Sequence, residues 1–503
     1  MDFSWGYLMQ GFATALSLQN IFWALLGCFI GTLVGVLPGI GPVSGIAILL
    51  PLTTVLPPTS AIIMMAAIYY GAMYGGSTTA IVVNIPGEAS SVPTAMDGYE
   101  MAKQGRAGPA LAISAIASFV AGTISVIALT FFAPLLANFA VVFGPPEYFA
   151  LMFFGLSLVI SLSGRALLKG VISMAIGLGA ALIGQDPLTG SARLTFGSAK
   201  LLGGVDFISV IVGLFAISEV MINVEQRITV ISEVEIGRWM PTWADIRQCL
   251  GTMLRCTGVG FLLGLLPGCA PSVTSFVAYD LEKRVSKHPE QFGKGAIQGV
   301  CAPEGSNNAT STAGFVPLFS FGLPTAPSMA VLLGGLMMYG LQPGPMLFKT
   351  NPDFVWAVIA SMYIGNVMLL VLNLPLVGMW AKIVKIPFYI LGPLIVFCTV
   401  VGTYSLRFQA YDVWVMLIFG VVGYFMRKLG FPVAPLVLAS VLAQMLETAM
   451  GQSLLISQGS PLIFFTRPIS AVFMGLAILS VGWGIWVQVR SKALVVAAGD
   501  DEY

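Results

Sequence analysis

Gly31-Thr-Leu-Val-Gly35-Val-Leu-Pro38-Gly39-Ile-Gly41-Pro42 has a counterpart in Gly260-Phe-Leu-Leu-Gly264-Leu-Leu-Pro267-Gly268-Cys-Ala-Pro271, and the two stretches start 229 residues apart. Two further motifs recur in the same order. Gly-Ser-Thr-Thr-Ala at 76–80 matches Gly-Ser-Asn-Asn-Ala at 305–309 at that offset, and Pro-Thr-Ala at 93–95 matches 324–326 at an offset of 231. Motifs repeated in order at a nearly constant offset indicate that the two halves of the chain share one structural plan.

The composition is that of a membrane protein. Of the 503 residues, 57% are hydrophobic and 9% are charged, and the mean hydropathy is +0.92. Soluble domains carry about 25% charged residues. Apolar runs at 110–132, 205–224, 354–377 and 469–487 are each near the roughly 20 residues that a membrane-spanning helix needs. We therefore predict an all-α polytopic protein with roughly 11 spans embedded in the lipid bilayer.

Charge and reactive residues argue against several functional classes. The net charge of +1 gives no indication of nucleic-acid binding. Six scattered cysteines and one histidine do not form a metal-binding pattern, so we expect no bound cofactor. We find no nucleophile–base set and no phosphate-binding loop, so an enzyme is disfavoured. Residues 1–102 contain no Lys or Arg, which a secretory signal would need, so the first apolar segment is expected to be retained.

The distribution of Lys and Arg predicts the topology. Most of the 23 basic residues cluster in alternate loops, which the positive-inside rule places in the cytoplasm. Residues 1–26 contain none, whereas the matching residues 230–255 contain three. The two copies are therefore expected to cross the membrane in opposite directions, as an inverted-topology repeat. The N-terminus is predicted to be external and the C-terminus cytoplasmic.

The breaks at Pro38-Gly39 and Pro267-Gly268 divide their segments into short arms. Residues 256–281 lie between two basic loops on the same side, and each arm is shorter than the roughly 20 residues of a span. A re-entrant hairpin fits both observations. The predicted boundaries are a first repeat at 1–224, with a hairpin at about 21–56 and a broken helix at about 61–96; a cytoplasmic linker at 225–255; and a second repeat at 256–503, with a hairpin at about 256–281 and a broken helix at about 296–337.

The helix breaks are candidate binding elements. Proline removes a backbone donor and glycine permits unusual backbone angles, so helices end there. Freed carbonyl groups can bind a cation, and N–H groups at the next helix start can bind an anion. An ordinary kink or close helix packing is the alternative. The candidates at the breaks are Pro38, Gly39, Gly41, Pro267, Gly268 and, at the last repeated motif, Thr325.

The polar motifs supply candidate ligands. Hydroxyl and amide oxygens suit Na⁺, and their hydrogens suit carboxylates. The alternative is hydrogen bonding between helices. The candidates are Ser77, Thr78, Thr79, Ser306, Asn307 and Asn308, with Na⁺ expected at Ser77, Thr78, Ser306 and Asn307.

Two acidic residues add to these candidates. Glu304 lies in an apolar segment, where an acid is a candidate proton carrier or cation ligand. Glu88 follows the Asn84–Gly87 break and is a weaker case. For each, the alternative is a carboxylate in an aqueous vestibule.

A family resemblance rests on these same residues. The motifs at 35–42, 74–77, 84–87, 97–99 and 302–309 resemble the large membrane subunit of the tripartite tricarboxylate transporters. The resemblance implies uptake of tricarboxylates or related carboxylates across the bacterial inner membrane, driven by an ion gradient. It also implies two partners, a small four-helix membrane subunit and a periplasmic solute-binding protein. More distantly, the paired hairpins are similar to the divalent-anion/Na⁺ symporters, whose transport domain moves as an elevator against a scaffold.

The sequence therefore predicts the permease subunit of a binding-protein-dependent secondary transporter. An autonomous cation-coupled carboxylate symporter or exchanger is the alternative, and a membrane-embedded enzyme is a distant third. The sequence leaves open whether the coupling ion is Na⁺ or H⁺.

Overall fold

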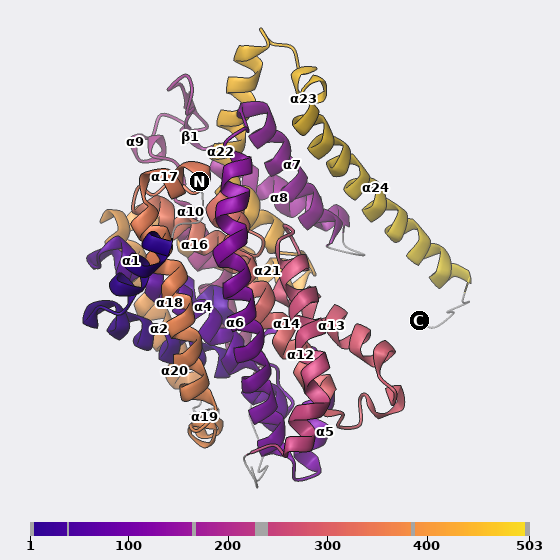
Figure 1. Ribbon diagram of the computed structural model, residues 1–503. Helices are drawn as coiled ribbons and strands as arrows, with labels where there is room; N and C mark the ends of the chain where they lie inside the picture. Colours follow the sequence, from indigo (N-terminus) through magenta and orange to yellow (C-terminus); the bar gives the residue numbers. More distant parts are fainter. Residues whose placement is uncertain (1–4, 38–39, 163–166, 227–239, 384–387, 498–503) are drawn as a thin grey trace. The chain divides into compact units, whose positions relative to one another are not determined.

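The computed structural model describes residues 5–37, 40–162, 167–226, 240–383 and 388–497 (Figure 1). Apart from one two-stranded β-ladder, the secondary structure of these residues is helical, which confirms the predicted all-α class. The chain divides into two compact units. Unit 1 comprises Met1–Ala140 and Phe215–Gln409, and unit 2 comprises Val141–Leu214 and Ala410–Tyr503.

Unit 1 holds both copies of the repeated motifs. Its elements are α1 (Trp5–Ala15), α2 (Leu18–Val36), α3 (Gly41–Leu49), η1 (Leu50–Val55), α4 (Pro58–Val83), η2 (Ala89–Ser91), α5 (Val92–Lys103), α6 (Ala107–Ala140), α11 (Ser218–Gln226), α12 (Trp243–Gly264), α13 (Pro271–Val285), η5 (Pro289–Gln291), α14 (Ile297–Ala313), α15 (Phe315–Phe321), α16 (Pro327–Met338), α17 (Pro345–Thr350), α18 (Pro352–Asn373), α19 (Val377–Ile383) and α20 (Phe388–Arg407). We call residues 18–103 copy one and residues 243–338 copy two.

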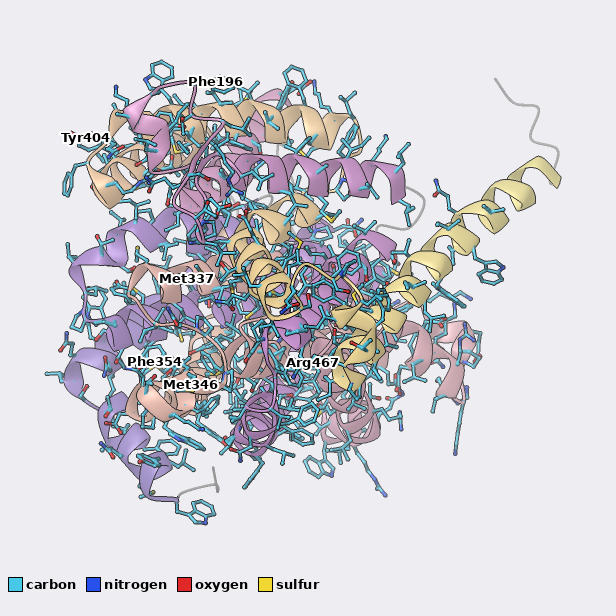
Figure 2. The ribbon with its side chains drawn as sticks, turned by 90° about the horizontal axis from the view of Figure 1, so that it is seen from above. Phe196, Met337, Met346, Phe354, Tyr404 and Arg467 are labelled. Carbon is cyan, nitrogen blue, oxygen red and sulfur yellow. The ribbon has the colours of Figure 1, made fainter. Side chains whose placement is uncertain are left out.

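Unit 2 is built around helix pairs. Its elements are α7 (Pro145–Ser161), α8 (Leu167–Ala181), β1 (Gly184–Gln185), β2 (Ala192–Arg193), α9 (Ala199–Leu202), α10 (Phe207–Val212), α21 (Ala410–Lys428), α22 (Ala434–Ile456), α23 (Ile463–Thr466) and α24 (Pro468–Ala497); the π-helical turn η4 (Gly213–Ile217) links α10 to α11. Arg467, labelled in Figure 2, precedes α24 and pairs with Glu147 at the start of α7 at 2.7 Å.

Eight helical segments of the described chain are long and apolar enough to cross a membrane, fewer than the roughly 11 spans predicted. They are Leu18–Val36, Ala107–Ala140, Phe207–Glu225, Pro352–Asn373, Tyr389–Arg407, Ala410–Lys428, Ala434–Ile456 and Pro468–Val489. Helix α4 has 26 residues but is not among them. Its glycines, tyrosines and hydroxyl residues lower its hydropathy. Glycines, amides and hydroxyl residues do the same in α14, which has 17 residues.

Helices α4 and α14 are enclosed by protein. Every residue from 60 to 82 of α4 and from 299 to 313 of α14 is buried. A helix that faces lipid cannot carry many polar groups, whereas an enclosed helix can satisfy them from its neighbours. Both polar motifs therefore lie in protein-lined surroundings.

Copy one packs α2 on α4 through glycines. A Cβ atom at Gly31 would lie 2.5 Å from the carbonyl oxygen of Ile68, and one at Gly35 would lie 2.2 Å from that of Ala72. Only glycine permits such close approach of two backbones. Residue numbers rise together on both helices, so α2 and α4 run parallel, and the intervening α3 and η1 must carry the chain back.

Copy two repeats this arrangement with α12 and α14. A Cβ at Gly260 would lie 2.4 Å from the carbonyl oxygen of Ser306, and one at Gly264 would lie 2.9 Å from that of Thr310. These helices are also parallel, so α13 must carry the chain back. Both copies thus contain a reversal where the sequence predicts a hairpin. Re-entry of these segments into a bilayer stays a prediction.

The observed boundaries differ from the expected ones in copy two. Helix α12 begins at Trp243, well before residue 256, because Thr242 and Asp245 form a capping box. The first arm of the expected hairpin is therefore a helix of 22 residues, and the end of the expected linker is helical. In copy one, α4 ends at the left-handed residue Asn84. In copy two, α14 is followed at Gly314 by the short helix α15, which ends at the left-handed residue Gly322. These breaks lie within the two predicted broken helices.

Candidate functional site

Polar side chains from the two copies meet between α14, α4 and the start of α5. Glu304 and Asn307 lie three residues apart on α14, and both are fully buried. The hydroxyl of Thr94 donates to Glu304 Oε1 at 2.5 Å. The amide of Asn307 donates to Glu88 Oε1 at 3.0 Å and to the carbonyl oxygen of Met73 at 3.4 Å. We call Glu88, Thr94, Glu304 and Asn307, with Ser90 and Ser91 of η2, the polar cluster.

The break after α4 positions Glu88. Asn84 turns the chain out of the helix with φ of 56°, and Glu88 itself is extended. A Cβ at Gly87 would lie 1.9 Å from the carbonyl oxygen of Gly35, so glycine lets this segment settle against α2. A Cβ at Gly76 would lie 2.6 Å from Glu88 Cγ. The glycines of copy one thus bring the Glu88 carboxyl group to the face of α14.

The polar cluster is acidic and makes no ion pair within the described chain. Its two carboxyl groups, on Glu88 and Glu304, repel each other when both are ionised. The salt bridges of unit 1 lie elsewhere, for example between Arg255 and Glu282 at 2.6 Å. The donors that hold the two carboxyl groups are neutral side chains, including the Ser90 hydroxyl on Glu88. Such an arrangement favours a cation over an anion at this place.

Asp97 joins the two copies a short distance along α5. Its Oδ1 accepts backbone N–H groups of Gly293, Gly295 and Ala296 at 2.8, 2.9 and 2.8 Å. Its Oδ2 accepts the hydroxyl of Tyr279 at 2.8 Å. Asp97 therefore fixes the start of α14, the helix that carries Glu304. In the sequence, residues 97–99 stand out only through the family resemblance. The sequence signal that could have identified Asp97 is an acidic residue next to a glycine, Gly98, in a chain with only 9% charged residues.

The predicted break residues of copy two lie together. The N–H of Gly268 donates to the carbonyl oxygen of Thr325 at 3.0 Å, and both Pro267 and Thr325 are buried. The turn after α12 and the break before α16 thus meet. In copy one, Pro38 and Gly39 lie outside the described residues. Gly41 starts α3 with φ of +66°.

Ser77, Thr78 and Thr79 lie inside the continuous helix α4, not at a break. Ser77 donates to the carbonyl oxygen of Tyr74 at 2.8 Å and accepts from Ser114 of α6 at 2.9 Å. Thr79 bonds within its own helix, and Thr78 is buried. The motif thus packs α4 against its neighbours.

Ser306, Asn307 and Asn308 face three different neighbours because successive helix residues point about 100° apart. Ser306 donates to the carbonyl oxygen of Thr274 in α13 at 3.1 Å, and Asn308 donates to Ser118 of α6 at 2.8 Å. Asn307 alone of the three contacts Glu88. The contacts therefore place Asn307 in the polar cluster and direct Ser306 away from it.

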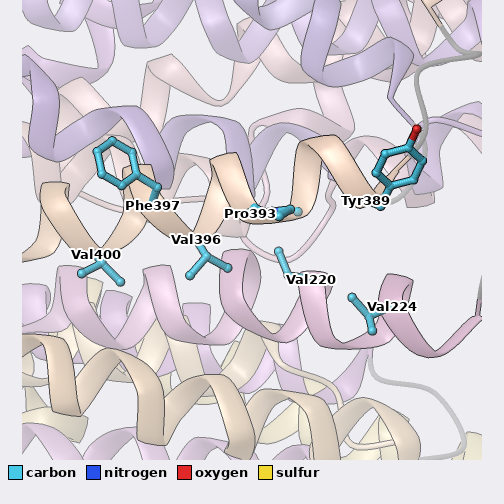
Figure 3. Close-up of a pocket in the computed structure, with 8 residues that line it drawn as sticks. Val220, Val224, Tyr389, Pro393, Val396, Phe397 and Val400 are labelled. Atoms are coloured by element: carbon cyan, nitrogen blue, oxygen red, sulfur yellow. The ribbon is translucent and has the colours of Figure 1, made fainter.

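A groove on another part of unit 1 is apolar (Figure 3). It lies between α11 and α20 and is lined by Val220, Val224, Tyr389, Gly392, Pro393, Val396, Phe397 and Val400. Tyr389 supplies its only polar side chain. The groove suits hydrocarbon rather than a charged solute, so the polar cluster is the better candidate site.

Comparisons with known proteins agree with the sequence motifs. Residues 21–438 match the model of the family described as "Tripartite tricarboxylate transporter TctA family". The chain is 43% identical over 497 residues, 98% of its length and 99% of the relative's, to an "uncharacterized 52.8 kDa protein in TAR-I ttuC' 3'region" of Agrobacterium vitis. A second protein of that organism, in the TAR-II ttuC' 3'region, is 40% identical over 242 residues, covering 48% of this chain and all of the relative. No solved structure matches significantly.

Proposed function

The chain belongs to the tripartite tricarboxylate transporter TctA family, and from that premise we propose that it is the permease subunit of a secondary transporter that imports tricarboxylates or related carboxylates. The transporter uses a cation gradient and receives its substrate from a periplasmic solute-binding protein. A small four-helix membrane subunit completes the complex in the bacterial inner membrane. The N-terminus lies outside and the C-terminus in the cytoplasm.

The observation that carries this proposal is the polar cluster between the two copies. Carboxyl groups enclosed by membrane helices are costly, and they are usually functional. Transporters built from repeats place their sites where the repeats meet. Glu88 and Thr94 come from copy one, and Glu304 and Asn307 from copy two. The cluster supplies negative charge for a coupling cation, which would travel with the anionic substrate.

The substrate carboxylates are proposed to bind beside the breaks of copy two. Helices α13 and α16 start directly after the turn at Gly268 and the break at Thr325, which are joined by a hydrogen bond. Helix N-termini present free N–H groups and a partial positive charge to anions. Such a site needs few basic side chains. We propose that unit 1 holds the moving site, as an elevator-type transport domain.

Reconstitution tests this function. The chain is placed in proteoliposomes with both partner subunits, and uptake of labelled citrate and related carboxylates is followed under separate Na⁺ and H⁺ gradients. We expect uptake that needs the binding protein and one of the gradients. Equal uptake without the binding protein would identify an autonomous carrier. Uptake that ignores both gradients would overturn the proposal.

A further inference from the structure

Three polar atoms of the polar cluster are buried and have no hydrogen-bond partner within the described part of the chain. They are Glu304 Oε2, Asn307 Oδ1 and Ser91 Oγ. Their side chains are all fully buried. Leaving a buried polar atom unpaired costs about 1–3 kcal/mol, so three in one region call for a physical explanation.

Asn307 and Ser91 border the Glu88 carboxyl group, and Glu304 lies one helical turn from Asn307 on α14. Asn307 donates through its amide nitrogen to Glu88, which leaves its carbonyl oxygen available nearby. The N–H of Ser91 donates to the Glu88 carbonyl oxygen at 3.1 Å. A Cβ at Gly76 would lie 2.6 Å from Glu88 Cγ and 2.8 Å from Ser91 Oγ, so both side chains border the same glycine. The Glu304 carboxyl group is near enough to Glu88 for their like charges to repel, which a cation between them would relieve.

We propose that Glu304 Oε2, Asn307 Oδ1 and Ser91 Oγ, with the Glu88 carboxylate beside them, bind one Na⁺ ion. All are oxygen atoms that can act as acceptors, and hard cations prefer such ligands. A proton on Glu304 Oε2 would provide one donor for a second atom such as Asn307 Oδ1 and would leave Ser91 Oγ unpaired, whereas a cation between the three oxygen atoms satisfies all three.

The arrangement also explains why each carboxyl group has one occupied oxygen. Thr94 holds Glu304 Oε1, and Ser90 and Asn307 hold Glu88 Oε1. These donors fix the direction of each carboxyl group and leave the other oxygen for an ion. The proposed ligands come from α14 and from the segment at 88–91, which belong to different copies. Binding would therefore fasten copy one to copy two.

The inference deepens the proposed function, because this ion would be its coupling cation, but it is tested without transport. The full chain is purified in lipid nanodiscs. Direct binding of radioactive ²²Na⁺ and the thermal unfolding midpoint are measured in NaCl, KCl and choline chloride at equal ionic strength. An ion that binds only the folded state raises the midpoint with its concentration. We expect saturable binding of Na⁺ and a rise of the midpoint that choline does not reproduce.

Variants identify the ligands. Glu304→Gln keeps the side-chain size and an acceptor for Thr94 but removes the charge, and Asn307→Ala removes the amide oxygen. Each is expected to weaken Na⁺ binding at least about tenfold. Glu304→Asp retains the charge and withdraws the oxygens by one methylene, so it serves if Glu304→Gln unfolds. Glu100→Gln, on the same helix as Thr94 and ion-paired with Lys103, is the matched control and should bind Na⁺ like the parent protein.

The possible outcomes test the Na⁺ site and the proposed transport function separately. Absence of Na⁺-specific binding, or parental affinity in both Glu304 variants and Asn307→Ala, would overturn the site. Na⁺-driven uptake with parental affinity in every variant would likewise overturn the site and leave the proposed function standing. Na⁺ binding that Glu304→Gln weakens, together with uptake that ignores a Na⁺ gradient, would support the site and reject Na⁺ coupling.

Discussion

In copy one the close helix contact joins Gly31 to Ile68, 37 residues later, whereas in copy two the equivalent Gly260 meets Ser306, 46 residues later. Relative to its partner α12, helix α14 is therefore shifted along its axis by about two and a half turns, compared with the position of α4 on α2. In copy one the polar motif at 76–80 follows Ile68, the residue that Gly31 contacts. In copy two the polar motif at 305–309 includes Ser306, the residue that Gly260 contacts. Thr310 adds a hydrogen bond to the carbonyl oxygen of Gly260 at 2.9 Å.

This difference shows that equal spacing in sequence does not mean equal position in space. Ser77 and Ser306 correspond at the offset of 229, yet one faces α6 and the other α13. Glu304 and Asn307 of copy two, by contrast, contact Thr94 and Glu88 of copy one. Copy one supplies the break with its carboxyl group, and copy two supplies the helix that completes the cluster.

The largest effect is expected at Asp97, which corresponds to Ser328 at the offset of 231. Asp97→Ala leaves three backbone N–H groups and the Tyr279 hydroxyl without their acceptor. We expect a loss of about 3 kcal/mol or more, measured as thermal or denaturant unfolding of the purified protein. Ser328→Ala should cost less than about 1 kcal/mol. Equal stability of the two variants would show that Asp97 does not hold α14.

The next effect concerns the glycine contacts. Gly35→Ala places a methyl group 2.2 Å from a backbone oxygen of α4, whereas the closest atom to the methyl of Gly264→Ala is 2.9 Å away. Overpacking typically costs about 1–3 kcal/mol, and we expect Gly35→Ala to lie at the upper end and Gly264→Ala at the lower. Gly258→Ala has no atom within 4 Å and is the control. The reverse order in unfolding measurements would contradict the tighter packing of copy one.

These contacts separate what the sequence could predict from what it could not. Hydropathy and the Pro-Gly pairs predicted membrane-type helices and the breaks at Asn84–Gly87 and Pro267-Gly268, because both are local properties. Glu304 and Asn307 were identified as candidates by residue type. Their contacts with Thr94 and Glu88 join residues 210 and 219 positions apart, which residue type and local spacing do not reveal. The role of Asp97 depends on a turn at 293–296 that is distant in sequence.

A third comparison uses the paired glycines at 76 and 305. A methyl group at Gly76 would contact Glu88 and Ser91 of the polar cluster, whereas one at Gly305 would lie 2.5 Å from the thiol of Cys256 in α12. Gly76→Ala is therefore expected to weaken the cation dependence of uptake about tenfold, and Gly305→Ala to lower stability by about 1 kcal/mol with unchanged cation dependence. Uptake at graded cation concentrations and unfolding midpoints check both. An equal change in the cation dependence of uptake in both variants would show that Gly76 is no closer to the ion site than Gly305.

The smallest effect concerns Ser77 and Ser306, which tests whether the motif hydroxyls pack helices or bind ions. Ser77→Ala removes a bond to Tyr74 in its own helix and an acceptor for Ser114, and Ser306→Ala removes a bond to Thr274 in a neighbouring helix. Hydrogen bonds between membrane helices contribute about 0.6 kcal/mol on average, so each variant should unfold slightly earlier than the parent protein. The half-saturating cation concentration for uptake should stay unchanged in Ser306→Ala, because that hydroxyl points toward α13 and away from Glu88. A clear rise in that concentration would return Ser306 to the ion site and show that copy two contributes two adjacent ligands where the contacts assign one.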